Sequence, residues 1–304
     1  MITEFQLIDD KIVPGGEGDC QVTVVTAPHF EYRRTLIDEH GLDEHTLNSA
    51  LDPDELSRME FEPDHLAVIY KRPMNVKQED EMVFGITSTG LFLFKDRLFV
   101  VSGDKVQPFD GKTFARVSTL PEMMLKLIYR SISHFLVHLK GVNQMSEALE
   151  DKINTSMENS ILIDLFTLEK TLVYYLNAIS SNRMLLEKLR QNHRKIGFTA
   201  EELEFLDDMM IENAQCYQQA EIYSNILASL MDARASIVGN NLNILMKTLN
   251  IITIGIMVPT FVVSAFSMNV KIPLASHSNA FWFVMSMALV SVISMMIFWR
   301  YRKW

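Results

Sequence analysis

The sequence predicts an α+β soluble body, followed by a helical hairpin, a long stalk helix and two transmembrane helices. Two uncharged stretches lie near the C-terminus, at 248–270 and 272–299. Each exceeds the roughly 20 residues that a helix needs to cross the bilayer core. Every acidic residue lies at or before Asp232. The chain therefore divides into an acidic soluble part and an uncharged membrane part.

Basic residues near the two stretches predict the topology. Lys247 precedes the first stretch and Arg300, Arg302 and Lys303 follow the second, whereas the connection between them holds only Lys271. Basic residues are retained on the cytoplasmic side of membranes. We therefore expect a multi-pass protein of the inner (plasma) membrane with both termini in the cytoplasm. Two buried core helices of a soluble protein are the alternative, and their length without charge disfavours it.

Charge and composition exclude several classes of function. The part up to Asp232 carries a net charge of −16 and the remainder +6. An acidic cytosolic body disfavours nucleic acid as a partner and is compatible with divalent cations, although solubility alone would explain much of the charge. Cys20 and Cys216 form no CxxC pair, so we expect both to be reduced. No P-loop or nucleophile–base pattern is present, and we expect no enzymatic activity.

Residues 1–118 are expected to form a cytosolic α/β domain. Two helices are expected at Tyr32–Glu39 and Asp43–Leu51, between short β-rich runs. Turn residues at Thr89-Gly90 and Lys95-Asp96 separate the last three runs and predict a meander. The glycine-rich segment 15–18 lacks the lysine of a phosphate-binding loop and is interpreted as a turn. The β-rich runs are Val22–Thr26, Leu66–Lys71, Met82–Ile86, Leu91–Phe94 and Arg97–Ser102.

Residues 119–198 are expected to form a cytosolic helical hairpin. Apolar residues recur at three- and four-residue spacing in Leu125–Leu149 and in Ile161–Leu189, which predicts two antiparallel helices. His134 and His138 lie four apart on the first helix, a spacing that zinc sites use. Packing or surface histidines are the favoured interpretation, because no carboxylate completes an HExxH pattern.

Residues 199–269 are expected to form one stalk helix that continues into the first transmembrane helix. Thr199 and Glu202 have the spacing of a capping box, and no proline follows Ala200 before Pro259. A helix from Ala200 to Phe266 would be about 100 Å long, so part of it must project from the membrane. Residues 270–279 then form an external loop, 280–299 the second transmembrane helix and 300–304 a basic cytosolic tail.

One face of the first transmembrane helix is small or polar. Its residues alternate in spacings of three and four, as in a heptad stripe. They could line a close-packed helix interface or, if several copies surround an axis, a pore with stacked polar rings. Leu249 could join Met246 in an apolar constriction. The stripe, called here the polar stripe, consists of Asn243, Met246, Asn250, Thr253, Met257, Thr260, Ser264 and Ser267.

The end of the chain resembles the CorA family of divalent-cation transporters. The resemblance covers the order of elements along the whole chain and implies a funnel-shaped homopentamer that transports divalent cations. It also implies that Asn269 stands at the outer pore mouth and that Asp208, on the stalk, helps bind regulatory magnesium between subunits. Glu212 lies four residues from Asp208, on the same helix face. The residues that carry the resemblance are Asn243, Met246, Leu249, Met257, Pro259-Thr260-Phe261 and Met268-Asn269.

The transported ion is less well determined by the sequence. Ser267 replaces the glycine of the family's Gly-Met-Asn signature, and Lys271 stands where magnesium-transporting relatives commonly have an acidic residue. Magnesium keeps its water shell, which neutral amides and hydroxyls can bind, so Mg²⁺ is favoured as the transported and regulatory ion. Zn²⁺, Co²⁺ and Ni²⁺ remain candidates. The alternatives are a proton-linked zinc transporter of the ZntB type and a membrane-anchored scaffold.

Overall fold

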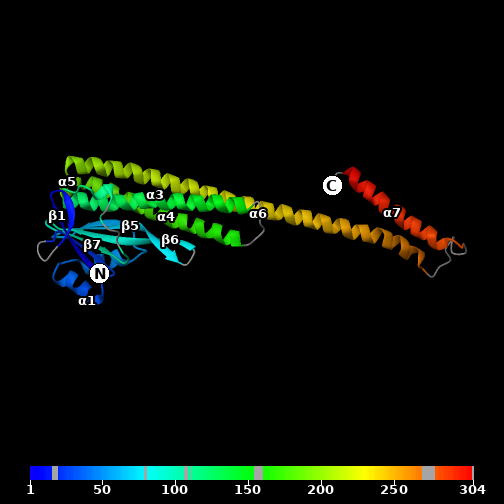
Figure 1. Cartoon of the computed structure of the whole chain (residues 1–304), viewed down its shortest axis with the longest axis horizontal. Coiled ribbons are helices and arrows are strands. Elements are labelled where there is room, and N and C mark those ends of the chain that lie inside the picture. Colours follow the sequence, from blue (N-terminus) through cyan, green and yellow to red (C-terminus); the bar gives the residue numbers. More distant parts are fainter. Residues whose placement is uncertain are drawn as a thin grey trace. The chain divides into compact units, whose positions relative to one another are not determined.

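The computed structural model describes residues 1–15, 20–78, 81–105, 109, 111–153, 160–268 and 278–302. They divide into two units, Met1–Met231 and Asp232–Trp304. The first unit combines a mixed sheet with helices on both of its faces, and the second consists of two apolar helical segments (Figure 1). Helix α6 (Ala200–Phe266) belongs to both units.

The described part of the first unit contains a seven-stranded sheet in the order β2-β1-β3-β7-β6-β5-β4. Strands β3 and β7 pair in parallel, and the other neighbouring strands pair antiparallel. The strands are β1 (Ile2–Ile8), β2 (Lys11–Pro14), β3 (Val22–Thr26), β4 (Arg58–Phe61), β5 (Leu66–Gln78), β6 (Glu81–Leu93) and β7 (Leu98–Ser102).

Both faces of the sheet are covered by helices. Helices α1 (Phe30–Asp38) and α2 (Glu44–Leu51) pack on one face, where Ile69 and Phe92 of the sheet join their buried leucines in one apolar core. Successive strand residues point to opposite faces, and Val68, next to Ile69, is also fully buried. The face on which Val68 lies packs against α3 and α4 (Figure 1). The central strands are therefore apolar on both sides.

Helices α3 (Leu120–Ile153) and α4 (Ser160–Gln191) run antiparallel. Near one end, Ser131 of α3 and Asn182 of α4 both donate a hydrogen bond to the carbonyl of Lys71 in β5. Further along, His138 of α3 lies 2.7 Å from the hydroxyl of Tyr175 in α4. Moving seven residues forward in α3 thus corresponds to moving seven back in α4, which confirms the predicted hairpin.

The N-terminal part of α6 packs on this hairpin within the first unit. It begins with the predicted capping box, in which Thr199 Oγ1 accepts from the amide of Glu202 at 3.2 Å and Glu202 Oε2 accepts from the amide of Thr199 at 2.7 Å. Glu202 also accepts a hydrogen bond from the hydroxyl of Thr119, at the start of α3. Further along, the buried Asn213 donates to the carbonyl of Ile179 in α4 at 3.1 Å. These contacts hold the N-terminal part of α6 against α3 and α4.

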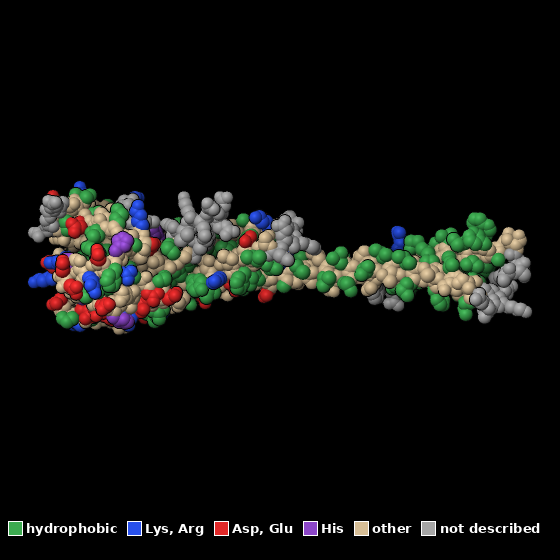
Figure 2. Space-filling view, turned by 90° about the horizontal axis from the view of Figure 1, so that it is seen from below, with side chains coloured by type: hydrophobic (Ala, Val, Ile, Leu, Met, Phe, Trp, Pro, Cys, Tyr) green, Lys and Arg blue, Asp and Glu red, His purple; other side chains and the backbone are tan. Residues whose placement is uncertain are grey.

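The second unit holds the C-terminal part of α6 and helix α7 (Ala280–Arg302). The most apolar segments of α6 and α7 have mean hydropathies of 2.0 and 2.2, and both helices are long enough to cross a membrane. Figure 2 shows apolar side chains covering this unit, whereas acidic and basic side chains gather over the first unit. The predicted end points of the long helix, Ala200 and Phe266, are confirmed.

One predicted turn is wrong. The run Met82–Ile86 and all of the run Leu91–Phe94 except Phe94 belong to a single strand, β6, and Thr89-Gly90 lies inside it. A Cβ atom at Gly90 would stand 2.5 Å from Cβ of Ala50 in α2, so glycine at this position permits the close approach of the helix rather than a turn. The turn at Lys95-Asp96 is confirmed by the hydrogen bond from the amide of Phe94 to the carbonyl of Arg97.

Three short strands were not predicted. β1, β2 and β4 lie at or near the sheet edge and have few fully buried residues, so they lack a clear alternation of apolar and polar residues. The predicted turn at 15–18 extends beyond Gly15 into residues outside the described part of the chain.

Candidate functional site

The polar stripe follows one face of the membrane part of α6. With 100° between successive residues, spacings of three and four keep these side chains in one narrow sector. They are exposed in the single chain, with 51% of Met246, 56% of the neighbouring Leu249 and 63% of Met257 accessible. Asn243 and Thr260 are also exposed. This face is therefore available either to other helices or to a water-filled path.

The threonine hydroxyl groups of the stripe donate their protons within the helix. Thr260 Oγ1 donates to the carbonyl of Ile256 at 2.7 Å, and Thr253 Oγ1 donates to the carbonyl of Leu249 at 2.8 Å. Each hydroxyl oxygen then presents its lone pairs outward as an acceptor. Waters bound to a divalent cation direct their hydrogens away from the ion, so they need acceptors. The stripe has the chemistry to bind a hydrated cation.

The proposed outer end of the stripe lies at the limit of the described residues. Ser267 and Met268 follow directly after the end of α6, and Ser267 Oγ donates to the carbonyl of Ser264 at 2.8 Å. Asn269, which the family resemblance implies at the outer pore mouth, and Lys271, which follows it closely, lie outside the described residues. Their roles stay predictions.

The second predicted site, Asp208 and Glu212, lies on the part of α6 that packs against α3. Asp208 is exposed and Glu212 is half-buried. Glu212 Oε1 accepts a hydrogen bond of 3.1 Å from the hydroxyl of Tyr129 in α3. Burial, followed by the negative charge of Glu212, raises the pKa of the Tyr129 phenol. The hydroxyl therefore stays protonated and holds one carboxylate oxygen of Glu212 in place.

Tyr129 was missed by the sequence reasoning. It lies 83 residues before Glu212, and nothing in the pattern of α3 distinguishes it from other half-buried aromatic residues. Its ring also packs edge-on against Phe205 of α6, with the ring centroids 5.3 Å apart. Among the described residues, no group of three or more His, Cys, Asp or Glu side chains is arranged to hold a metal ion. A cation at Asp208 would therefore need further ligands from outside the described residues of this single chain.

The histidine pair on α3 is a packing feature in the described structure. His138 Nδ1 lies 2.7 Å from the hydroxyl of the buried Tyr175, and burial lowers the pKa of His138. Burial, assisted by the charge of Arg130, lowers the pKa of His134 to about 4. Neither histidine is joined by a third metal-binding side chain within the described residues. The zinc interpretation of this pair is therefore not supported.

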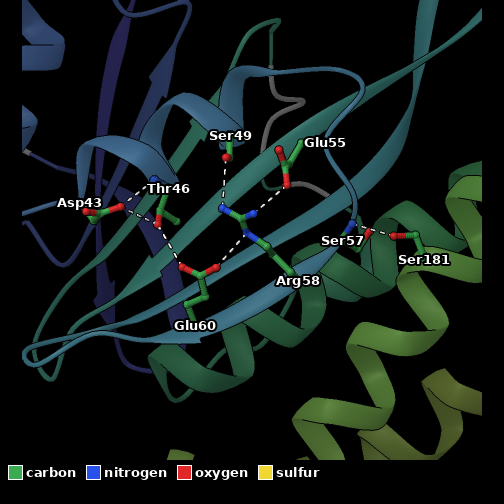
Figure 3. A network of polar contacts seen from close by, with 8 residues as sticks. All are labelled: Asp43, Thr46, Ser49, Glu55, Ser57, Arg58, Glu60 and Ser181. Atoms are coloured by element: carbon green, nitrogen blue, oxygen red, sulfur yellow. Dashed lines mark hydrogen bonds and ion pairs between the residues drawn. The ribbon is translucent and has the colours of Figure 1, made fainter.

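A second cluster of carboxylates is neutralised internally (Figure 3). Arg58 Nη1 lies 2.8 Å from Glu55 Oε1, and its Nε lies 3.1 Å from Glu60 Oε1. Asp43 caps α2 and accepts hydrogen bonds from the amide and the hydroxyl of Thr46 at 2.8 and 2.9 Å. These acids tie α2 to strand β4 and are already paired. They are poor candidates for binding a regulatory cation.

Comparisons with known proteins agree over nearly the whole chain. Residues 24–303 match the family model described as CorA-like Mg²⁺ transporter protein. The cobalt/magnesium transport protein CorA of Methanocaldococcus jannaschii is 28% identical over 291 residues, which span 91% of this chain and 89% of the relative. The protein of the same name from Thermotoga maritima is 19% identical over 275 residues, 87% of this chain and 77% of the relative.

Solved structures show the same fold. The complete structure of the CorA magnesium transporter from M. jannaschii aligns with a TM-score of 0.82 at 22% identity, covering 98% of this chain and 96% of that chain. The cytoplasmic domain of ZntB from Vibrio parahaemolyticus aligns with a TM-score of 0.61 at 10% identity, covering 78% of this chain and 98% of that chain.

Proposed function

The chain belongs to the family of CorA-like Mg²⁺ transporters, and we propose that it carries Mg²⁺ through a pore formed by five copies of α6. The family assignment makes it a membrane transporter of divalent cations with two C-terminal transmembrane helices, which disfavours the scaffold interpretation. Mg²⁺ as the cargo, five copies around the pore and gating by cytosolic Mg²⁺ belong to this proposal.

The outward-facing acceptors of the polar stripe carry this proposal. In a ring of five helices, Thr260 would present five hydroxyl oxygens whose protons are held by backbone carbonyls. Mg²⁺ retains several waters because it dehydrates reluctantly. Neutral acceptors can bind those waters without removing them, so the ion is stabilised yet remains mobile. Asn243 and Asn269 would supply amide oxygens at the two ends of the path.

The chemistry of the spans favours magnesium over zinc. Zinc sites use nitrogen and sulfur ligands in direct contact with the metal, and neither His nor Cys occurs within Asn243–Phe266 or Ala280–Trp299. Asp and Glu are also missing from both segments, which leaves no carboxylate for a proton relay within the membrane. The likeness to ZntB is one of fold alone. The proton-linked zinc transporter is therefore not favoured, and Co²⁺ and Ni²⁺ are secondary cargo candidates.

Gating is proposed to depend on cytosolic Mg²⁺ at Asp208 and Glu212. Asp208 is exposed, and Tyr129 holds Glu212 beside it on the same face of α6. In a homopentamer, the carboxylates of neighbouring copies would repel one another unless a divalent cation neutralised them. Bound cation would hold the closed state, and its loss would favour opening. The proposed topology in the inner membrane, with both termini in the cytoplasm, would put Asp208 and Glu212 on the cytosolic side.

Ion uptake into liposomes tests the proposed cargo. Purified protein would be reconstituted, and uptake of Mg²⁺, Zn²⁺, Co²⁺ and Ni²⁺ would be compared with and without a proton gradient. We expect Mg²⁺ uptake that does not require the gradient. Zinc uptake that depends on the gradient, without magnesium uptake, would contradict the proposal and support the ZntB-type alternative.

A further inference from the structure

An open cavity of about 280 Å³ lies within the first unit, where the sheet meets helix α4. Pro53 and Asp54 line it from the segment that follows α2, Lys71 lines it from β5, and Tyr174 and Asn177 line it from α4. None of its lining residues belongs to the polar stripe or to the proposed gating site. The transport proposal therefore leaves this cavity, called here the Lys71 cavity, without a role.

Lys71 is held in place by a buried network. The residue is only 4% exposed. Asn182 Oδ1 accepts a hydrogen bond from the amide of Lys71 at 2.9 Å. Asn182 Nδ2 and Ser131 Oγ donate to its carbonyl at 2.8 and 2.6 Å. Helices α3 and α4 thus fix the backbone from which the lysine side chain reaches the cavity.

The ammonium group of Lys71 has donors to spare. It donates a hydrogen bond to the carbonyl of Pro53, which is its one polar contact within the described residues. An ammonium group carries three N–H donors, and a buried charge is costly unless it is paired. Burial accordingly lowers the pKa of Lys71, against the opposing charges of Asp54, Asp52 and Glu55. A carboxylate that entered the cavity would pair with this ammonium and favour its charged form.

The cavity also carries a negative group. Asp54 is exposed at its wall, and its charge is the acidic charge that acts most strongly on Lys71. Glu55 is already paired with Arg58 at 2.8 Å. A simple anion would be attracted by Lys71 and repelled by Asp54. A molecule that carries both a carboxylate and an ammonium group would be attracted by both residues.

The size and remaining wall of the cavity favour a small ligand. Sites for small molecules usually have volumes of roughly 300 to 1,000 Å³, so a cavity of about 280 Å³ is too small for a nucleotide. Ile86 of β6 and Ala178 of α4 supply short apolar wall segments, and Asn177 offers an amide with both donors and an acceptor. This wall suits a short aliphatic or hydroxylated side chain.

We propose that the Lys71 cavity binds a small free amino acid, with its carboxylate at the Lys71 ammonium and its own ammonium group near Asp54. The ligand would bridge the α/β domain and helix α4. This binding adds to the proposed transport function and does not depend on the identity of the cargo or on the number of copies around a pore.

Isothermal titration calorimetry of the purified full chain tests the proposal. Glycine, L-alanine, L-serine and L-threonine would be titrated separately, and we expect L-alanine to bind. Ethylamine lacks the carboxylate of L-alanine and should bind at least about tenfold more weakly, because it cannot accept from Lys71. Propionate lacks the ammonium group and should bind about threefold to fivefold more weakly, since its lost partner Asp54 is exposed.

Three variants identify the residues that hold the ligand. Lys71→Met should weaken the binding of L-alanine at least about tenfold. Lys188→Met is the matched control, since Lys188 is an exposed residue of α4 that does not line the cavity, and it should leave the affinity unchanged. Asp54→Asn, at an exposed position, should bring L-alanine and propionate to similar affinities. Circular dichroism would establish that each variant is folded.

Several results would overturn the proposal. Absence of binding by all four amino acids would exclude such a ligand. Ethylamine binding as strongly as L-alanine would exclude a carboxylate at Lys71, and so would wild-type affinity in folded Lys71→Met protein. If L-alanine kept its advantage over propionate in Asp54→Asn, recognition of the ammonium group by Asp54 would be rejected. Equal weakening in Lys71→Met and Lys188→Met would indicate unspecific attraction.

Discussion

Replacing Thr260 with valine removes one proposed ring of acceptors from the pore while keeping the shape of the side chain. In the structure, Thr260 is exposed and donates a hydrogen bond to the carbonyl of Ile256 at 2.7 Å. Valine is also β-branched and is nearly equal to threonine in volume. The helix should therefore persist, and the change should remove the outward-facing oxygen together with its hydrogen bond to Ile256.

The expected size of the effect follows from that single oxygen. A hydrogen bond with a charged partner contributes about 1.5 to 3 kcal/mol, and water bound to Mg²⁺ resembles such a partner. Loss of one contact of about 1.5 kcal/mol would slow the flux about tenfold. A hydrated ion that touches two of the five hydroxyls at once would lose about 100-fold. We therefore expect a reduction of Mg²⁺ flux between these limits.

The assay is Mg²⁺ uptake into liposomes, monitored with an enclosed magnesium-sensitive dye. Thr248→Val is a matched control, because Thr248 lies on the same helix and donates to the carbonyl of Ile244 at 2.9 Å but is not part of the polar stripe. The control should change the flux less than about twofold, within the range of an ordinary surface substitution. Wild-type flux through assembled Thr260→Val protein would refute the assignment of Thr260 to the pore.

Three further predictions concern the soluble unit. Asp208→Ala should raise the internal Mg²⁺ concentration that half-inhibits flux by at least about fivefold, measured in liposomes with buffered internal Mg²⁺. Asn182→Ala should lower the free energy of unfolding by about 3 kcal/mol in chemical denaturation, because it leaves two buried donors without an acceptor. The pKa of His134 falls to about 4 on folding, so the unfolded chain binds a proton more readily below about pH 6.5 and stability should decrease from there toward pH 4. His134→Gln should remove that part of the pH dependence in thermal unfolding.

Two of these predictions have a control on the same helix. Glu221→Ala replaces an exposed acid on another face of α6 and should leave inhibition by internal Mg²⁺ unchanged. Equal inhibition in Asp208→Ala would reject the regulatory role. Asn177→Ala, at an exposed position of α4, should cost less than about 0.5 kcal/mol. An equal loss of unfolding free energy in Asn177→Ala and Asn182→Ala would contradict the buried hydrogen-bond network. If His134→Gln left the pH dependence of thermal unfolding unchanged, burial of a neutral imidazole at this position would be contradicted.

The long helices could be predicted from sequence because their signals are local. Thr199 and Glu202 form the capping box that starts α6, and no proline follows Ala200 before Pro259, close to the end of the helix at Phe266. Strand β6 could not be predicted in full. Glycine is needed at position 90 because Ala50 of α2 packs closely against the strand there, and this contact is made by a different element of the chain. Local sequence gives the chemistry of Gly90 but not its neighbour.

The same distinction applies to the candidate sites. The polar stripe is periodic, so its residues could be placed on one helix face before the structure was known. The hydrogen bond between Tyr129 and Glu212 joins residues 83 positions apart and became visible only when α3 and α6 were packed together. Contacts between distant segments require the tertiary fold.

The flux carried by Asn269→Ala protein tests the proposed pore most directly. Five copies of Asn269 at the end of the first span would present amide oxygens to the water shell of the ion, and alanine cannot replace them. We expect Mg²⁺ uptake to fall at least about tenfold while size-exclusion chromatography shows an intact oligomer. Wild-type uptake through assembled Asn269→Ala protein would contradict the account, and so would a loss of uptake that is explained by loss of assembly alone.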